Sequence, residues 1–198
     1  MLRTNHLLAF LAASALSLGP AYAQEVYKSE ASVQIFGTFT STTWDQGVRQ
    51  TATDSGGTLG SYRYFFNDYN GLEMNYGFAE GTQKYLAIFG PSSAVRANSH
   101  EATAAYVLRY PVHRVVPFLE IGTGALVFDP LNGAPPTTEA KAAFVYGGGI
   151  DVGFAHRCFL RAEYRGLVYD TPDFNTFFLG PQRITNRAEP TIGFGIKF

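Results

Sequence analysis

Apolar and polar residues alternate along eight segments of the chain, and this alternation constrains the fold more than any other feature of the sequence. A two-residue period is that of a β-strand with one apolar and one polar face. In every segment, the charged residues well inside it fall on the polar parity. The 198 residues are enough for one ordinary domain. The sequence therefore predicts a single all-β domain whose strands each separate an apolar face from a charged one.

The connections between the predicted strands alternate in length. The strands are expected at residues 31–43, 57–66, 72–81, 99–110, 115–128, 140–154, 158–169 and 188–198. Short turns are expected at 67–71, 111–114 and 155–157, and longer loops at 43–56, 82–98, 129–139 and 170–187. Because no 3.6-residue pattern of helix length interrupts them, neighbouring strands should pair as antiparallel hairpins in an up-and-down order.

Short turns at one end and long loops at the other are typical of bacterial outer-membrane barrels. Eight strands make the smallest usual barrel, whose lumen is filled by side chains. Turning every strand inside out would give a soluble barrel with an apolar interior, and parity alone does not exclude it. Loop alternation, an export signal and aromatic strand ends favour an eight-stranded antiparallel up-and-down transmembrane β-barrel, with short periplasmic turns and longer extracellular loops.

The N-terminal residues resemble an export signal. A positively charged start precedes the apolar stretch LLAFLAASALSLG, and Ala21-Tyr22-Ala23 matches a small-x-small cleavage site. We therefore expect residues 1–23 to be a cleaved signal peptide and residues 24–198 to be the barrel. An uncleaved anchor is the alternative, but the segment is short for one. After Ala23 no run of about 18 apolar residues follows, so no membrane helix is expected. The expected location is the cell outer membrane.

The charges inside the predicted strands are expected to face the lumen. They are Arg63, Glu73, Glu101, Arg109, Glu120, Lys141, Asp151, Arg161, Glu163, Arg165 and Lys197. In a narrow lumen unpaired charges would each cost several kcal/mol, so pairing across strands is predicted. The pairs would form a polar plug, or alternatively a gate that opens a narrow conduit when partners exchange. Inward glycines, including Gly147 and Gly149, would either leave voids for water or make room for long arginines.

Four strands end their apolar faces on aromatic residues, namely Phe66, Tyr110, Phe154 and Phe198. Aromatic rings suit the boundary between hydrocarbon and headgroups, so these four are expected to form a periplasmic girdle. The last of them closes the alternating strand TIGFGIKF, in which Ile192, Phe194, Ile196 and Phe198 share one face.

With these features the chain resembles the small eight-stranded outer-membrane barrels, the outer-membrane protein A transmembrane-domain-like and outer membrane beta-barrel group, over residues 30–198. The resemblance implies that Ile192, Phe194, Ile196 and Phe198 carry the signal recognised by the barrel-assembly machinery. It also implies contact with outer-membrane lipid and lipopolysaccharide. Some members carry a peptidoglycan-binding domain after the barrel, and no such domain is expected here. The resemblance is architectural, and it identifies no particular activity.

Composition and motifs favour no enzymatic, nucleic-acid or metal chemistry. The net charge is -1, so no basic surface indicates nucleic acid, and the single cysteine, Cys158, excludes an internal disulfide. Ser99-His100-Glu101 has the residue types of a lipid A deacylase, but neighbours in a strand point to opposite faces. Asp170 and Asp173 alone do not make a calcium site. We expect no catalytic residue, no metal and no cofactor.

The loops are the remaining candidates for function. The last one combines Tyr169 and Phe174 with the run Phe177-Phe178-Leu179, an apolar exposure that suggests folding over the barrel mouth or binding a partner at the cell surface. The sequence thus predicts a structural or cell-surface interaction role, with a plugged lumen and loops that recognise an extracellular ligand. The alternative is a narrow, low-conductance channel for water, ions or small solutes.

Overall fold

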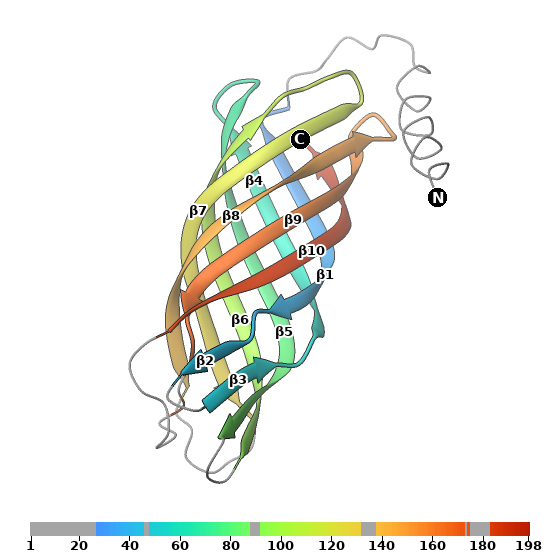
Figure 1. The fold of residues 1–198 in the computed structure, drawn as a ribbon. Coiled ribbons are helices and arrows are strands. Elements are labelled where there is room, and N and C mark those ends of the chain that lie inside the picture. Colours follow the sequence, from blue (N-terminus) through green and yellow to red (C-terminus); the bar gives the residue numbers. More distant parts are fainter. Residues whose placement is uncertain (1–26, 46–47, 88–91, 132–137, 173, 175–182) are drawn as a thin grey trace, which may run out of the picture.

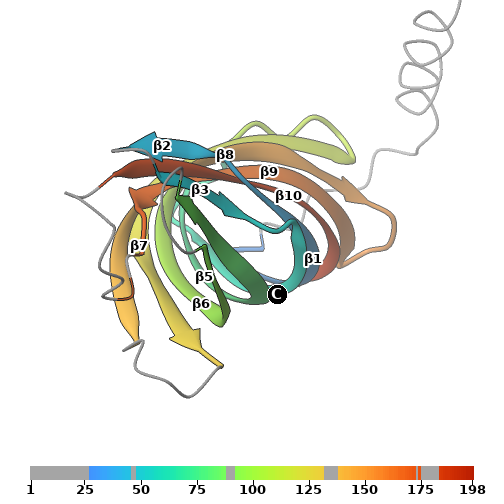
Figure 2. The same cartoon turned by 60° about the horizontal axis from the view of Figure 1, so that its bottom comes forward.

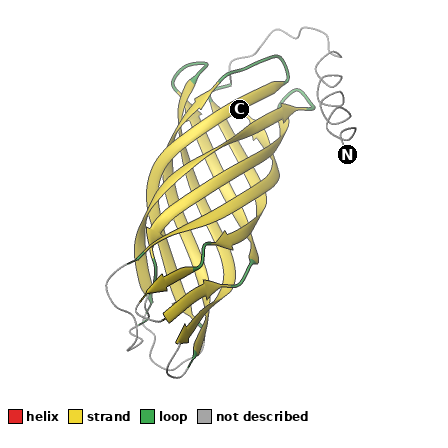
Figure 3. Ribbon diagram, viewed as in Figure 1, coloured by secondary structure: helices red, strands yellow, loops and turns green. Residues whose placement is uncertain are grey.

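The computed structural model describes residues 27–45, 48–87, 92–131, 138–172, 174 and 183–198. Every regular element in these ranges is a β-strand (Figure 3). No helix within the same ranges has the length and apolar character needed to cross a membrane. The expected signal peptide, Asp173 and the run at 177–179 lie outside the described residues.

Eight of the ten strands close into an antiparallel up-and-down barrel (Figure 1). The ten are β1 (Ser29–Thr40), β2 (Thr43–Asp45), β3 (Val48–Ala52), β4 (Ser55–Phe65), β5 (Asn70–Ala87), β6 (Ser93–Arg109), β7 (Val115–Pro130), β8 (Glu139–Gly153), β9 (Cys158–Asp170) and β10 (Ile184–Lys197). Around the barrel the order is β1, β4, β5, β6, β7, β8, β9 and β10, and β10 pairs with β1. The predicted fold class is confirmed, and Figure 2 shows the ring from the end where β2 and β3 lie.

The wall separates two chemically different faces. Along β4, Tyr62 and Tyr64 point outward, whereas Arg63 and Phe65 are buried. Along β10, Ile192, Phe194 and Ile196 are exposed. Outward residues of the other strands are equally apolar over the middle of the barrel. Charges therefore gather inside the ring, and a band of aliphatic and aromatic side chains surrounds it.

Two of the predicted long loops are wrong. Within 43–56, β2 and β3 form a hairpin that pairs with the outer end of β5. Within 82–98, β5 and β6 continue as a paired ladder as far as Tyr85 and Ser93. The apolar alternation fades there because the outward residues become polar, as at Lys84 and Arg96, although the backbone pairing continues. The two strands project beyond the apolar band at the long-loop end (Figure 1).

The four predicted girdle residues occupy equivalent places. Phe66, Tyr110, Phe154 and Phe198 each follow directly on the last residue of β4, β6, β8 or β10. Their exposed fractions are 54%, 65%, 58% and 53%. Since these four strands run in the same direction, the rings all lie at the short-turn end. An exposed ring of aromatics at one end of an apolar band has the form of an interfacial girdle.

Candidate functional site

Three arginines and their acidic partners cross the middle of the lumen, and we call this set the charged layer. Arg63 comes from β4, and Arg161 and Arg165 come from β9. Their exposed fractions are 1%, 1% and 0%, although arginine is seldom fully buried unless it is paired. The acids around them are Glu30, Glu73, Glu101, Glu120, Asp151, Glu163 and Glu189.

Arg161 forms the most regular pair of the charged layer. Its Nε lies 2.7 Å from Asp151 Oδ1 and its Nη2 lies 2.8 Å from Asp151 Oδ2. This two-pronged geometry is the strongest form of a guanidinium–carboxylate contact. Asp151 and Arg161 are direct register partners on β8 and β9. The same guanidinium also reaches Glu30 on β1, at 3.4 Å, and therefore connects three strands.

Arg165 spans the lumen from one wall to the other. Its Nη1 donates to Glu101 Oε1 at 2.6 Å and to Glu189 Oε2 at 3.2 Å, and its Nη2 donates to Thr103 Oγ1 at 3.1 Å. Glu101 and Thr103 belong to β6, which is separated from β9 by β7 and β8. A side chain that bonds across this distance occupies the section of the lumen that an open pore would need.

Arg63 neutralises a group of three converging carboxylates. Glu73, Glu120 and Glu163 place one oxygen each within 4.8 Å of one another. Arg63 bonds directly to Glu73 and lies 3.7 Å from Glu163 and 3.9 Å from Glu120. Arg165 adds a contact of 3.5 Å to Glu120. Guanidinium groups therefore supply the positive charge that a metal ion would otherwise bring to this carboxylate group.

Aromatic rings support the arginines on the side of the short turns. The Arg109 guanidinium lies 3.4 Å from the ring centre of Phe65, and that of Arg63 lies 3.9 Å from Phe118. Arg161 lies 5.1 Å from the ring of Phe159. Such contacts offset part of the cost of removing a cation from water.

The inward glycines at the charged layer leave no empty space. A Cβ at Gly147 would lie 2.8 Å from Glu120 Oε1 and 2.7 Å from the carbonyl oxygen of Tyr164. At Gly149 it would lie 3.0 Å from the ring of Phe118. These two positions leave no void, but the groups that crowd them are Glu120, Phe118 and backbone atoms, and not the long arginines of the second alternative.

The eleven predicted lumen charges all point inward, but they are not equally enclosed. Eight are buried: Arg63, Glu73, Glu101, Glu120, Asp151, Arg161, Glu163 and Arg165. Arg109, Lys141 and Lys197 lie nearer the two ends, with side chains that are 10%, 18% and 23% exposed. Lys141 contacts Glu139, at 3.3 Å.

Sequence reasoning missed Glu30, Arg187 and Glu189. Glu30 binds Arg109 at 2.8 Å and Arg161 at 3.4 Å, and Arg187 Nε lies 2.6 Å from Glu189 Oε1. Glu30 and Arg187 precede the predicted strand starts by one residue, and Glu189 lies one residue inside. All three have the inward parity, so strands longer by one residue would have included Glu30 and Arg187, and Glu189 was already within the predicted strand.

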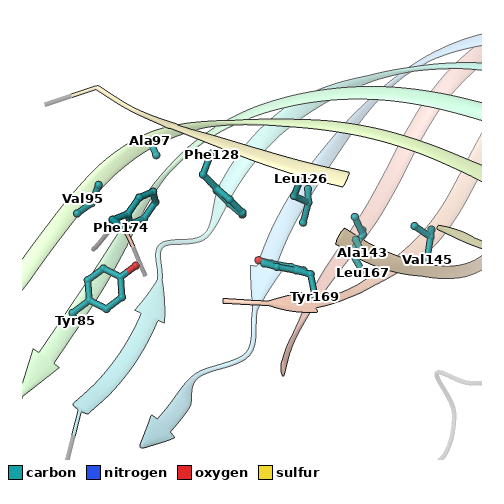
Figure 4. Close-up of a cluster of buried hydrophobic side chains, with 10 residues drawn as sticks. All are labelled: Tyr85, Val95, Ala97, Leu126, Phe128, Ala143, Val145, Leu167, Tyr169 and Phe174. Atoms are coloured by element: carbon teal, nitrogen blue, oxygen red, sulfur yellow. The ribbon is translucent and has the colours of Figure 1, made fainter. Parts of the chain in front are cut away.

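A second layer inside the lumen is apolar and was also missed. This apolar layer consists of Tyr85, Val95, Ala97, Leu126, Phe128, Ala143, Val145, Leu167, Tyr169 and Phe174 (Figure 4). It lies between the charged layer and the long-loop end. The signal was present in Leu126-Val127-Phe128 and Leu167-Val168-Tyr169, which are apolar on both parities and so predict burial on both faces.

The start of the last loop folds into the barrel mouth. Phe174 is 2% exposed, packs edge-on against Phe128 and takes a left-handed backbone conformation with φ of 47°. Its backbone N–H donates to Glu139 Oε1 at 2.7 Å. The carbonyl oxygen of Pro172 accepts from the Tyr85 hydroxyl at 3.0 Å. Of the two roles expected for this loop, the described part has the position of a cap.

The structure separates the members of Ser99-His100-Glu101. Ser99 and Glu101 are buried inside the barrel, whereas His100 faces outward and its Nδ1 lies 2.8 Å from the hydroxyl of Tyr76. His113 and His156 are exposed in the short turns. The imidazoles of these three residues do not converge with a nucleophile and an acid.

Comparison with known proteins agrees with this architecture. A family model described as the outer membrane protein beta-barrel domain matches residues 8–182. No curated protein sequence matches the chain. The outer membrane protein OprG from Pseudomonas aeruginosa is 14% identical, with a TM-score of 0.61 over 87% of this chain and 96% of that one. Neisserial surface protein A is also 14% identical, with a TM-score of 0.57 over 86% and 97%.

The barrel domain of OprF from Pseudomonas aeruginosa is similar too, with a TM-score of 0.54 and 15% identity over 87% of this chain and 100% of that one. At such identities the likeness concerns the fold. The family match, in contrast, spans most of the sequence and agrees with the closed ring of strands and its apolar outer band. This chain belongs to the family of outer membrane protein beta-barrel domains.

Proposed function

We propose that the protein is a sealed outer-membrane barrel that holds interaction elements at the cell surface. The observation that carries this proposal is the span of Arg165 across the lumen, from β9 to Glu101 and Thr103 on β6. Because the guanidinium is fully buried and bonded on both sides of the ring, passage would require several ion pairs to break at once. The proposed role is not enzymatic.

The interaction elements are the parts that project beyond the apolar band. Among the described residues they include the β2–β3 hairpin and the outer ends of β5 and β6. Strand ladders present side chains at fixed spacings, so this end offers a more rigid surface than loops alone. We propose that these elements contact an extracellular ligand, while the outer wall contacts lipid and lipopolysaccharide.

We also propose how the protein is exported and assembled. Residues 1–23 are proposed to be removed as a signal peptide, and the C-terminal strand is proposed to be recognised by the assembly machinery. The outward row of Ile192, Phe194, Ile196 and Phe198 supports this, because all four side chains are exposed on the outer wall and accessible to a partner. An Ile192→Ser/Phe194→Ser variant should accumulate unfolded in the periplasm, whereas Gln34→Ser should still be inserted.

A narrow channel is the second candidate. A small, partly open pocket of about 20 Å³ at the long-loop end is lined by Thr38, Ser55, Ser99 and Arg187 among others. It leads to the outer boundary of the charged layer. If the ion pairs exchanged partners, the pocket would become the entrance of a low-conductance path.

Planar-bilayer recording of the purified protein distinguishes the two candidates. A sealed barrel gives no current steps at any voltage, whereas a gated channel gives small steps whose frequency rises when Arg165 is replaced. Replacing the hairpin and long loops by short linkers adds a cellular test. Loss of adhesion with unchanged permeability supports the interaction role, and the reverse result supports transport.

A further inference from the structure

One ring of the apolar layer does not belong to the barrel wall. Nine members of this layer lie on strands β5 to β9, and the tenth, Phe174, comes from the last loop. Figure 4 shows its ring beside Val95, Ala97 and Phe128. The ring is 2% exposed and meets Phe128 edge-on, with the two ring centres 6.5 Å apart. The strands therefore form a site for one aromatic ring, and Phe174 occupies it.

Phe174 reaches this site with an unfavourable backbone conformation. Its φ of 47° lies in the left-handed region, which a residue with a bulky side chain seldom adopts. Its backbone N–H donates to Glu139, which also contacts Lys141 at 3.3 Å. The Pro172 carbonyl oxygen accepts from the Tyr85 hydroxyl at 3.0 Å. Water at the barrel mouth can replace these hydrogen bonds, so burial of the ring is the main force that holds Phe174 in place. A free aromatic molecule buries the same kind of ring without the left-handed residue, and can compete.

A small polar pocket adjoins the ring site. This pocket, of about 20 Å³, shares Ala97, Phe128 and Tyr169 with the apolar layer. Toward the charged layer it is lined by Ser99 and Arg187. About 10–15 Å³ is enough for one water molecule, so the pocket has room for one oxygen atom and not for a second ring. An aromatic ring in the site could therefore carry one hydroxyl group into the pocket.

The charges around the pocket favour an uncharged hydroxyl over an anion. Arg187 is already paired, because its Nε lies 2.6 Å from Glu189 Oε1 and its Nη2 lies 3.9 Å from Glu101 Oε2. Its Nη1 donates to Ser99 Oγ at 3.0 Å, so the hydroxyl hydrogen of Ser99 remains available for an acceptor in the pocket. The two glutamates would repel a carboxylate. A hydroxyl can accept from Ser99 and brings no charge.

We propose that the outer part of the lumen binds a small uncharged phenol, which enters from the long-loop end and takes the place of Phe174. In the bound state the ring lies against Val95, Ala97 and Phe128, and the hydroxyl lies in the pocket beside Ser99. Binding moves Phe174 out of the barrel mouth. The proposal requires neither conduction through the lumen nor a ligand at the hairpin, so its failure would leave the proposed function untouched.

The test is a titration of the detergent-solubilised, methyl-labelled protein with 4-fluorophenol, followed by NMR. The methyl signals of Val95, Ala97 and Leu126, which are buried in the lumen, should shift saturably. Leu119 and Leu160 are exposed on the outer wall, and their methyl signals serve as the control. Because aromatic solutes also dissolve in micelles, shifts at the outer wall report non-specific uptake. Equal shifts on both faces would overturn the proposal.

Two further probes test the polar pocket. Fluorobenzene has the same ring without the hydroxyl, so it should bind about tenfold more weakly, because one hydrogen bond is lost. The anion 4-fluorobenzoate should also bind at least about tenfold more weakly, because its charge would be removed from water beside Glu101 and Glu189. Equal affinity for 4-fluorophenol and fluorobenzene would contradict the assignment of the hydroxyl to the pocket.

The variant Phe174→Ala tests whether Phe174 competes with the phenol. If its ring is out of the site about a tenth of the time, Phe174→Ala should tighten the binding of 4-fluorophenol about tenfold. Phe39→Ala, which removes an exposed ring from the outer wall, is the matched control and should bind as the unchanged protein does. An unchanged affinity in Phe174→Ala, or binding in that variant alone, would overturn the proposal.

Filling the ring site provides the opposite test. Ala97→Leu adds volume where the ring lies, so 4-fluorophenol should no longer shift the methyl signals of Val95 and Leu126. Urea unfolding checks that this variant is folded, and the results with Phe174→Ala decide the matter if it is not. Undiminished binding by folded Ala97→Leu would show that the phenol binds elsewhere.

Discussion

The charged layer and the apolar layer fill neighbouring parts of one lumen by opposite means. In the charged layer, long side chains meet in directed pairs, such as Arg161 with Asp151, and a missing partner leaves a buried charge. In the apolar layer, Leu126, Leu167 and Phe128 fill space without directed bonds. Loss of one group there leaves a cavity. The charged layer therefore depends on balanced charge, and the apolar layer depends on filled volume.

Removing a guanidinium from the charged layer should have the largest effect. Arg165→Met removes the short contact of Glu101 and leaves Glu189 paired with Arg187 alone, so the free energy of unfolding should fall by about 3–5 kcal/mol. The measurement is urea unfolding in phospholipid vesicles, followed by Trp44 fluorescence. Arg96→Met, which breaks the exposed pair with Glu80, is the control and should cost less than about 1 kcal/mol. Equal losses would mean that the charged layer is not enclosed.

Truncation in the apolar layer should cost somewhat less. Leu167 is fully buried, so Leu167→Ala should lower the free energy of unfolding by about 2–5 kcal/mol through the cavity that it leaves. Leu160→Ala, on the lipid side of the same strand, should cost below about 1 kcal/mol because lipid fills the space. The same unfolding assay compares the two, and a larger loss at Leu160 would contradict the assigned faces.

A methyl group added at the charged layer should have a smaller effect. Gly147→Ala places a Cβ against Glu120 and a backbone carbonyl, and should destabilise by about 1–3 kcal/mol. At Gly60, on the outer wall, a Cβ would meet only the Tyr76 carbonyl oxygen at 3.9 Å. Gly60→Ala should therefore be nearly neutral in the same assay. A neutral Gly147→Ala would indicate free space beside Glu120.

Conductance should respond least to a change in the apolar layer alone. Phe174→Ala removes the ring that caps the mouth, but the charged layer beneath it stays closed. Planar-bilayer current should stay at the baseline, as for the unchanged protein. Current steps in this variant would show that the apolar layer, and not the charged layer, is the seal.

The sequence was sufficient to predict which residues of the strands face outward and which face the lumen. It was insufficient to predict which lumen residues contact one another. Arg161-x-Glu163-x-Arg165 places three charges on one face through strand geometry alone, and the structure buries all three. The partner of each charge depends on how neighbouring strands are staggered in the closed barrel. The sequence of a single strand does not determine this stagger. The reach of Arg165 to Glu101 is of this kind.

The strand ends were predicted least well. The alternation of apolar and polar residues follows the apolar band and ends where the band ends. The outer parts of β5 and β6 and the β2–β3 hairpin lie beyond it, so they were predicted to be loops. The position of Phe174 depends on a left-handed turn and on Glu139, and neither has a signal in local hydropathy. Leu126 and Leu167 are apolar residues on the inward parity, and this pattern indicates the apolar layer. Only the charged residues of that parity were used for the prediction.

The central claim is that lipid surrounds the barrel and that the charged side chains of its strands face the lumen. Photolabelling of β9 with a lipid-soluble carbene precursor, read residue by residue by mass spectrometry, tests this most directly. Leu160, Ala162 and Tyr164 should be labelled, and Phe159, Arg161 and Glu163 should not. Labelling of the odd-numbered residues, or of both sets alike, would contradict the account.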